Sequence, residues 1–377
     1  MEASLAFKAD KLTVLMIDDD QAISEVVKDA LSDKFPDASF VYHQQFDAAI
    51  MEQVKPGIVI LDLYKGNTAS GENAGAPLWK LIMSKHFIPV IIFTGGEATL
   101  EPPLPENHPF VELVSKGAGK EAAVMDVIAK FIPRASDLKA LYAELDEIIH
   151  TTLAESPEET WTAITDDAAR TKVLVRGVRR RIAARMDLSA MSNGETLCSW
   201  EQFIIPPIES QLLCADLIRA TDGNATDATS YRLVLTPSCD LVPHGGKAKI
   251  SDVLVAPCVK MDECLKTIEI TASRISKERE DCEKELRRSL TQPHIAGYVP
   301  LPAHPAHLPH MAAKLRKLEL IPLSDIATAG ETGKKFVRVA SIDSPFREQI
   351  AFAYGQLATR FGMPDRDIAG WAKDLLQ

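Results

Sequence analysis

The chain has 377 residues, of which 46% are hydrophobic and 25% are charged, and its formal net charge is −11. This length fits roughly two to three domains, and the composition is that of a folded globular protein rather than a disordered or fibrous one. No apolar run approaches the roughly 18–20 residues that cross a bilayer, and the first residues lack the pattern of a secretory signal. We therefore expect a cytoplasmic protein.

Charge and cysteine are unevenly distributed, and the change comes near Pro133. Residues 1–133 hold 11 Lys, no Arg and 19 Asp or Glu, whereas every Arg and all six Cys come later. An acidic first part is a poor surface for nucleic acid and suits a cation better. The cysteines form no CxxC pair, which favours free thiols over disulfides or a zinc site.

The first 133 residues alternate between short apolar runs and amphipathic stretches. Runs of this kind are typical of buried parallel strands, and helices are expected between them. Five strands alternating with helices predict a doubly wound parallel sheet of the flavodoxin-like kind, with its ligand site at the carboxyl ends of the strands. The expected strands are 12–17, 39–42, 58–61, 88–93 and 111–114, and the expected helices are 21–34, 46–54, 75–86 and 119–132.

Polar residues follow four of these five strands. The first strand leads into Asp18, Asp19 and Asp20, the third into Asp62, the fourth into Thr94, and the fifth into Ser115 and Lys116. Converging carboxylates repel one another unless a hard cation joins them, and Mg²⁺ binds one or two carboxylates together with phosphate oxygens. An ammonium and a hydroxyl beside such a cluster can hold the remaining oxygens of a phosphoryl group. The pattern therefore predicts a pocket that accepts phosphate on a carboxylate.

Taken in order, the segments MIDDDQAI, VILDL, IIFTGG and LVSKGAG resemble the receiver domain of two-component response regulators over about the first third of the chain. The resemblance implies that Asp62 is the phosphoacceptor. It also implies that Asp18 and Asp19 hold Mg²⁺ directly or through water, with the backbone carbonyl of Tyr64 as a further metal ligand. The phosphoryl donor would be a partner histidine kinase or phosphotransfer protein.

The same resemblance implies that Thr94 hydrogen-bonds the phosphoryl group, and that Lys116 pairs with Asp62 before the reaction and with the phosphate after it. The alternative is that these charges only solvate a sheet edge, or that the domain is an inert pseudo-receiver acting as a scaffold. Asp20 is expected to cap the first helix.

Two departures from the family pattern bear on signalling. Leu113 stands where many receivers carry an aromatic residue, and four prolines after Thr94 exclude a regular helix in the usual fourth position. We therefore expect phosphorylation to act through the loop 65–75 or the Pro-rich loop after Thr94, since an added charge needs a bistable element to be felt at a distance.

Residues 134–192 are expected to form a helical linker. An apolar seam two heptads long runs through the first part of this linker, and it fits either a dimerising helix over 137–150 or a helix packed on its own effector domain. The seam consists of Leu138, Leu141, Leu145 and Ile148.

An arginine cluster follows in the same linker. The cluster fits three interpretations: it binds phosphates of nucleic acid or an acidic partner, it is a solvated helix face, or it makes an inhibitory contact with the acidic receiver. The cluster consists of Arg176, Arg179, Arg180, Arg181 and Arg185.

Residues 193–377 are expected to form a mixed α/β effector with a small, barrel-like β-rich unit at 198–258. A long charged helix is expected over 260–291, where it would bind a partner or a second copy of the chain. The turn 236–240 carries Cys239 and Asp240, with His244 close behind, which fits turn capping or a Cys–His nucleophile. Four histidines in a Pro-rich run, at 294, 304, 307 and 310, fit an extended connector or a metal site.

Together these features predict an atypical response regulator with a receiver at 1–133, a linker at 134–192 and an effector at 193–377. Mg²⁺-dependent phosphoryl acceptance on Asp62 would control the effector. The effector is expected to be a protein-interaction module, and the alternatives are a nucleic-acid-binding or an enzymatic effector.

Overall fold

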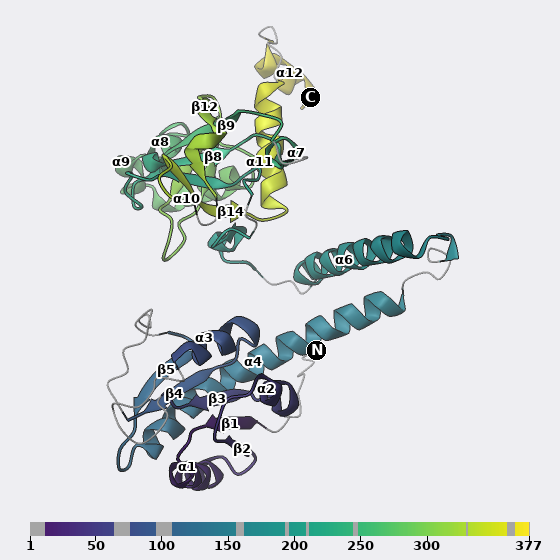
Figure 1. The fold of residues 1–377 in the computed structure, drawn as a ribbon. Coiled ribbons are helices and arrows are strands. Elements are labelled where there is room, and N and C mark those ends of the chain that lie inside the picture. The colour runs from purple at the N-terminus through teal and green to yellow at the C-terminus, as the bar shows by residue number, and fades with distance from the viewer. Residues whose placement is uncertain are drawn as a thin grey trace. The chain divides into compact units, whose positions relative to one another are not determined.

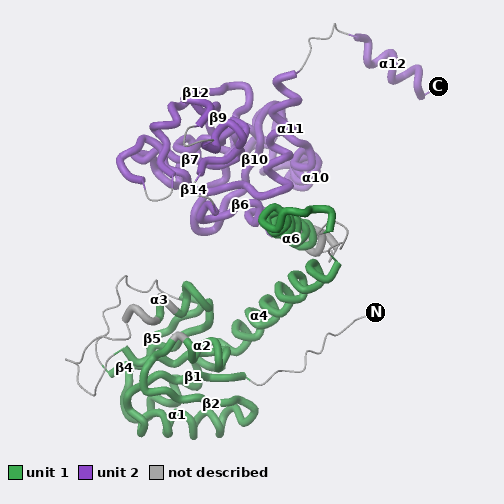
Figure 2. The backbone as a smooth tube through the Cα atoms, turned by 45° about the vertical axis from the view of Figure 1, so that its right-hand side comes forward, with its two compact units in different colours: residues 1–194 green, residues 195–377 purple. Residues whose placement is uncertain are grey.

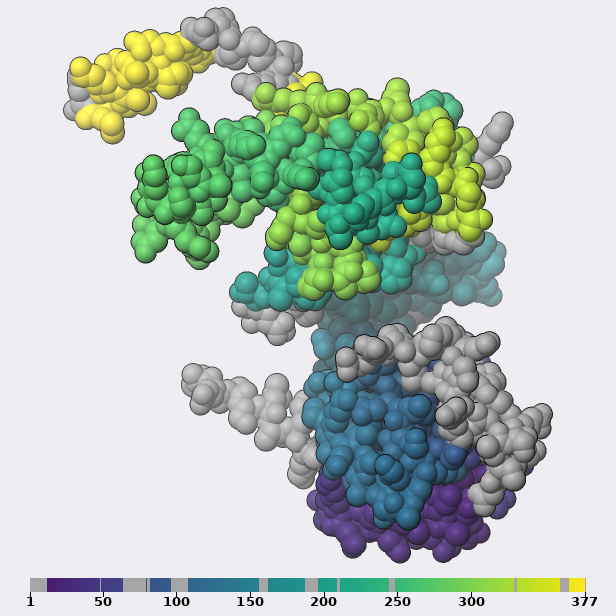
Figure 3. Space-filling view, turned by 90° about the vertical axis from the view of Figure 1, so that its left-hand side faces the viewer, coloured from purple at the N-terminus to yellow at the C-terminus, as the bar shows by residue number. Residues whose placement is uncertain are grey.

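The computed structural model describes residues 12–63, 76–95, 108–155, 162–192, 196–208, 211–243, 248–328, 331–359 and 366–376. The chain divides into two compact units, Met1–Gly194 (unit 1) and Glu195–Gln377 (unit 2). Figures 1 and 2 show the two units, and Figure 3 shows each as a body of closely packed atoms. Each is described by itself.

Unit 1 is built on a five-stranded parallel sheet in the order β2-β1-β3-β4-β5. All five predicted strands are present, with three helices between them and a fourth after the last strand. The strands are β1 (Thr13–Ile17), β2 (Ser39–His43), β3 (Ile58–Leu61), β4 (Val90–Thr94) and β5 (Val111–Ser115), and the helices are α1 (Gln21–Lys34), α2 (Ala48–Val54), α3 (Ala76–Lys85) and α4 (Glu121–Ala154). The doubly wound fold expected of this part is confirmed.

Helices cover both faces of this sheet, which explains why its central strands are apolar throughout (Figure 1). On one face Val27 and Leu31 of α1 pack with Ile128 and Phe131 of α4. On the other face Met51 of α2 packs with residues of α3 and the sheet. The polar residues at the strand ends are therefore held on a packed support of three layers, with the sheet between two layers of helices.

Helix α4 differs from the prediction, because the helix expected at 119–132 and the linker helix expected after it form one element. The helix has 34 residues and contains Pro133, whose side chain is exposed. Pro133 removes one hydrogen bond. The helix is held to the sheet on both sides of this position, by Lys130 with Glu112 and by Arg134 with the carbonyl of Pro109. The Tyr142 hydroxyl, further along α4, donates to the carbonyl of His86 at 3.0 Å.

Helix α6 (Asp167–Ser192) completes unit 1 and lies beside the far end of α4 (Figures 1 and 2). The guanidinium groups of Arg181 and Arg185 both pair with Glu155, which follows the last residue of α4. Two of the five clustered arginines therefore hold the helical pair together, and Arg176, Arg179 and Arg180 are exposed.

Unit 2 contains a nine-stranded sheet in the order β10-β11-β9-β8-β7-β14-β13, with β12 added to β9 and β6 to β14. The mixed α/β, β-rich character expected of this part is confirmed. The sheet is larger than the small barrel-like unit expected at 198–258, because it also takes strands from 298–342, and its order in the described residues is open. The strands are β6 (Phe203–Ile204), β7 (Leu217–Ala220), β8 (Tyr231–Val234), β9 (Asp252–Lys260), β10 (Tyr298–Leu301), β11 (Met311–Lys314), β12 (Glu319–Pro322), β13 (Ile326–Ala327) and β14 (Phe336–Ile342).

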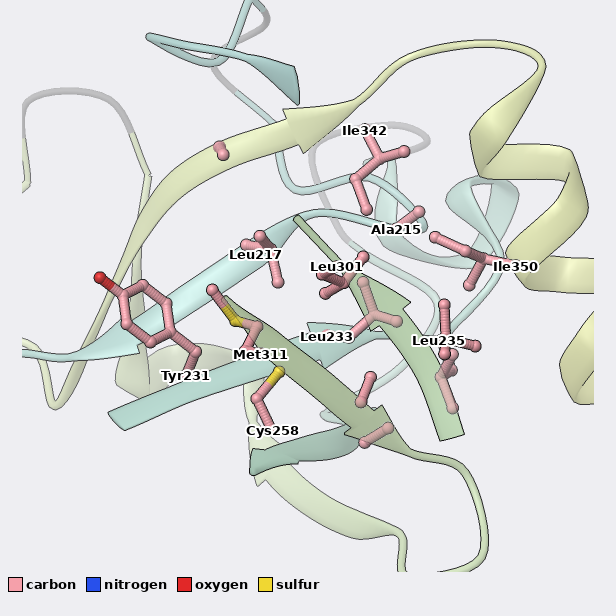
Figure 4. Packing of buried hydrophobic residues seen from close by; sticks show 14 of the residues in the cluster. Ala215, Leu217, Tyr231, Leu233, Leu235, Cys258, Leu301, Met311, Ile342 and Ile350 are labelled. Atoms are coloured by element: carbon pink, nitrogen blue, oxygen red, sulfur yellow. The ribbon is translucent and has the colours of Figure 1, made fainter. Parts of the chain in front are cut away.

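The main core of unit 2 lies between this sheet and α11 (Phe346–Ala358), with Leu217, Leu233 and Ile350 among its members (Figure 4). Tyr231 is fully buried, and its hydroxyl donates to the carbonyl of Ala225. A last short helix, α12 (Ile368–Leu375), buries no residue.

The prediction of one long charged helix over 260–291 is wrong. The segment forms three short helices, α8 (Met261–Lys266), α9 (Ala272–Ile275) and α10 (Arg279–Leu290). Glu269 has a φ of 60°, which ends the first helical stretch, and Thr271 caps the second. Cys264 packs with Ile295 and Tyr298 of the same unit, so part of the apparent seam is used inside unit 2.

Candidate functional site

The carboxyl ends of four neighbouring parallel strands bring the polar residues of unit 1 to one sheet edge. Ile17 of β1 pairs with Leu61 of β3, so Asp18 and Asp62 follow at the same level. Thr94 of β4 pairs with Ser115 of β5, which places Lys116 next to them. These residues are far apart in the chain, and the parallel register of the strands brings them together.

Asp18 is the most enclosed carboxylate of the group, with 2% of its surface exposed. One oxygen accepts the backbone N–H of Asp20 at 3.0 Å, and the other lies 2.7 Å from the Lys116 ammonium. Burial raises the pKa of the Asp18 carboxyl, and the bonds to Lys116 and Asp20 only partly oppose that rise. The contacts therefore fix the position of Asp18, although its carboxylate is less well solvated than in water.

Lys116 joins the two carboxylates, since its Nζ also lies 3.0 Å from Asp62 Oδ2. Burial lowers the pKa of the ammonium, but Asp18 and Asp62 together outweigh burial, and the net shift is upward. The second oxygen of Asp62 accepts the N–H of Leu63 at 2.8 Å. The side chain of Asp62 is therefore fixed at both oxygens.

Asp18, Asp19 and Asp62 form the group of acidic side chains that fits a cation. One oxygen from each lies within 4.8 Å of the others, and Asp19 is exposed to solvent. Three carboxylate oxygens at this spacing match the oxygen ligands of a hard divalent cation, and the exposed side leaves room for the waters that Mg²⁺ retains. The donor set fits a divalent metal site.

Thr94 completes the edge with a hydroxyl that is buried and has no hydrogen-bond partner in the described residues. A buried hydroxyl without a partner costs free energy, so its presence beside a charged pocket calls for an explanation. A ligand oxygen reaching the pocket would supply the missing bond.

Other predicted residues of unit 1 fall in three groups. Asp20 caps α1 as expected, by accepting the N–H groups of Ala22 and Ile23. Leu113 is 44% exposed on β5. Tyr64, the loop 65–75 and most of the Pro-rich loop lie outside the described residues, so the expected metal ligand and signalling loops stay predictions.

The segment 236–240, expected to be a turn, leads into a short helix, α7 (Ser238–Leu241), and its hydroxyl groups bind the backbone. The Thr236 hydroxyl accepts the N–H of Leu254, and the Ser238 hydroxyl accepts that of Cys214. Cys239 is exposed and contacts the carboxylate of Asp240. His244 lies outside the described residues, so its pairing with Cys239 stays a prediction.

Three of the four histidines in the Pro-rich run accept backbone hydrogen bonds through Nδ1. His294 accepts from Gly297, His304 from Ala306, and His310 from Ala303. The ring of His304 also lies against His307 and Trp200. In the described residues these side chains shape turns, and they form no group of three metal ligands.

Sequence reasoning did not single out a buried polar cluster in unit 2. Arg338 pairs with Asp216 at 2.7 Å, and the Ser341 hydroxyl joins both. The available signal is a charged residue inside the apolar run of β14, which requires a buried partner. Asp216 also accepts the N–H of Leu213, so both of its oxygens have partners within unit 2. We therefore assign the cluster a structural role.

Among the described residues, no helix is both long and apolar enough to span a bilayer. No family model and no curated protein matches the chain.

Several of the solved structures that resemble this chain are receiver domains that match about its first third. The signal receiver domain of a DNA-binding response regulator from Colwellia psychrerythraea 34H is 22% identical over 32% of this chain and 99% of its own, with a TM-score of 0.25. The response regulator domain of Thermotoga maritima CheB is 23% identical over 34% and 98%, also with a TM-score of 0.25. The anti-anti-sigma factor PhyR from Bartonella quintana is 20% identical over 36% and 52%, again with 0.25.

Proposed function

We propose that unit 1 is a phosphoacceptor receiver and that Asp62 is the residue modified. The observation that carries this proposal is the shared ammonium of Lys116, which lies within 3.0 Å of both Asp18 and Asp62 at the end of the parallel sheet. A purely structural ion pair does not need a second carboxylate or an unpaired hydroxyl beside it, as Thr94 supplies here.

The chemistry would be transfer of a phosphoryl group from a histidine of a partner kinase or phosphotransfer protein. A carboxylate oxygen of Asp62 forms the new O–P bond, the P–N bond of the phosphohistidine breaks, and the histidine nitrogen leaves with the electron pair and takes up a proton. Lys116 loses its bond to Asp62 and pairs with a phosphoryl oxygen, and the Thr94 hydroxyl donates to another. Mg²⁺ held by Asp18, Asp19 and Asp62 would neutralise charge on the incoming group.

We propose a protein-interaction module as the output of unit 2. It has its own core, and it leaves large apolar side chains exposed, among them Leu320, Phe352 and Trp371. A catalytic site is the weaker candidate, because the group of described side chains that fits a metal lies in unit 1, and the described neighbour of Cys239 is the carboxylate of Asp240 rather than a histidine.

The test is modification of the full chain by acetyl phosphate with Mg²⁺, read by intact mass. One phosphoryl group should be added to the wild-type chain, and none to Asp62→Asn. The matched control is Asp20→Asn, which makes the same change two residues from Asp18 and keeps a side chain suited to capping α1. This control should be modified as the wild type is.

Equal modification of Asp62→Asn, or no modification of a folded wild-type chain with and without Mg²⁺, would show that the pocket is not a phosphoacceptor.

A further inference from the structure

Strand β2, the neighbour of β1 in the sheet, carries a tyrosine next to the aspartate edge (Figure 1). Tyr42 of β2 pairs with Met16 of β1, and the N–H of Asp18 donates to the carbonyl of His43 at 3.1 Å. Met16 is part of one core cluster, and Phe40, two residues before Tyr42, packs against the same cluster. Because side chains two residues apart share a face of a strand, Asp18 and Tyr42 lie on the same face. A tyrosine ring is long enough to bring its hydroxyl from this position to the level of the Asp18 carboxylate.

The electrostatic surroundings of the Tyr42 hydroxyl agree with this placement. Burial raises the pKa of the phenol, and the negative charges of Asp18, Asp19 and Asp20 raise it further. The interaction between two charges falls with the distance between them, so these carboxylates act on a group that is near them. The hydroxyl therefore lies within the field of the acidic residues that fit a cation.

The hydroxyl of Tyr42 is buried, and no residue in the described ranges forms a hydrogen bond with it. The exposed Gln44 lies near enough to oppose the rise in the pKa, but its amide does not reach hydrogen-bond geometry with the hydroxyl. A phenylalanine would fill the same space without burying a polar group, as Phe40 does earlier on the strand. The hydroxyl thus needs an explanation beyond packing.

We propose that Tyr42 is a positioning residue of the divalent-metal site, and that its phenolic oxygen accepts a hydrogen bond from a water of the bound cation. This inference rests on the proposed metal site and deepens it. Mg²⁺ keeps several of its waters when it binds carboxylates, and a water on a cation is a strong hydrogen-bond donor. A direct bond from the hydroxyl to an aspartate is not formed in the described residues, which favours contact through water.

The order of the strands separates this role from that of Thr94. Strand β2 lies beside β1, which leads into Asp18, whereas β4 lies beside β3, which leads into Asp62. Tyr42 therefore acts on the side of the metal ligands, and Thr94 on the side of the phosphoacceptor. Residues that orient the ligands and waters of a metal tune its affinity without binding it themselves.

Calorimetric titration of the full chain with Mg²⁺ tests the proposal. Tyr42→Phe should raise the dissociation constant for Mg²⁺ about fivefold, as expected when one net hydrogen bond is lost. Without Mg²⁺, the melting temperature of this variant should equal or exceed that of the wild type, because the replacement removes a buried hydroxyl that lacks a hydrogen bond. A purely structural role gives the reverse pattern, with a lower melting temperature without Mg²⁺ and an unchanged affinity.

The matched control is Tyr354→Phe in α11, which makes the same change in unit 2 and should leave the Mg²⁺ affinity unchanged. Gln44→Leu removes the amide beside the hydroxyl and should also leave the affinity unchanged. A loss of affinity in Gln44→Leu as large as that in Tyr42→Phe would overturn the proposal, because the hydroxyl would then act through Gln44.

Two further outcomes separate the role of Tyr42 from the function of unit 1. Equal Mg²⁺ affinity in the wild type and in Tyr42→Phe would overturn the role of Tyr42 and leave the metal site in place. A wild-type chain that binds no Mg²⁺ would overturn the metal site and the role of Tyr42 together. Modification of Asp62 is measured independently by intact mass.

Discussion

Lys116 balances the charge of the aspartate pocket, because its ammonium is shared between Asp18 and Asp62. Replacing it in Lys116→Met leaves two carboxylates facing each other, one of them buried. We expect the metal-free protein to lose about 2 kcal/mol of stability at neutral pH, less than for a fully buried pair because the pocket is open on one side. Mg²⁺ should raise the melting temperature of the variant more than that of the wild type, since no ammonium competes for the oxygens. Thermal unfolding with and without Mg²⁺ measures both effects. An equal rise in the melting temperature of the two proteins would contradict competition between Lys116 and Mg²⁺ for the carboxylate oxygens.

The pH dependence of this pocket follows from the raised pKa of Asp18. The raised pKa means that the Asp18 carboxylate takes up a proton at a higher pH than an ordinary aspartate does. Because a cation binds the carboxylate, Mg²⁺ binding should weaken as pH falls through that raised pKa. The raised pKa of Lys116 acts at the other end of the scale: its ammonium contributes stability at every pH below its ordinary pKa and loses it only as pH rises through the raised value. Calorimetric titration with Mg²⁺ at several pH values checks the acid side, and an unchanged affinity down to the ordinary aspartate range would refute it.

Replacing Thr94 tests ligand binding separately from the stability of the metal-free protein. Its hydroxyl is buried without a partner, so Thr94→Val removes a polar group while keeping the side chain's shape. We expect the metal-free variant to be as stable as the wild type or more stable by about 1 kcal/mol. The same variant should lose the stabilisation that beryllofluoride, a phosphoryl mimic, gives to the wild type with Mg²⁺. Melting curves with and without the mimic test this, and a stability gain equal to that of the wild type would rule out a phosphoryl contact for Thr94.

At the scale of elements, the strands and helices of unit 1 could be predicted because each has a local signal: an apolar run for a strand between two helical layers, or an amphipathic period for a helix. The same local patterns gave wrong predictions where contacts with residues distant in the chain determine the structure. The run at β14 pairs with β7 far away in the chain, and the apparent heptads of 260–291 bury Cys264 against Ile295 and Tyr298 instead of forming one helix. The site residues could be predicted because they follow the strands, and the resemblance implied the pair of Lys116 with Asp62, whereas the second ion pair of Lys116, with Asp18, depends on the order of strands in space.

Helix α4 offers a test of how its far half is held. The Tyr142 hydroxyl donates to the carbonyl of His86, so Tyr142→Phe should remove one anchor between α4 and the turn before β4. We expect a loss of about 0.5–1 kcal/mol and faster amide exchange over residues 138–150. The control is Tyr354→Phe in α11, whose hydroxyl makes no hydrogen bond in the described part of the chain and whose loss should leave α4 unchanged. Unaltered exchange in Tyr142→Phe would mean that packing alone holds the helix.

At the scale of the whole molecule, the two units should fold independently, because the core clusters of each draw only on its own residues. A fragment of residues 1–194 keeps the full parallel sheet together with Asp18, Asp62, Thr94 and Lys116. We expect it to accept phosphate from acetyl phosphate at the rate of the full chain, and a fragment of residues 195–377 to show a cooperative unfolding transition of its own. Calorimetry of the full chain should then resolve the transitions of both fragments. A slower or faster reaction in the fragment would show that unit 2 acts on the pocket, since every side chain of the proposed chemistry is present in both proteins.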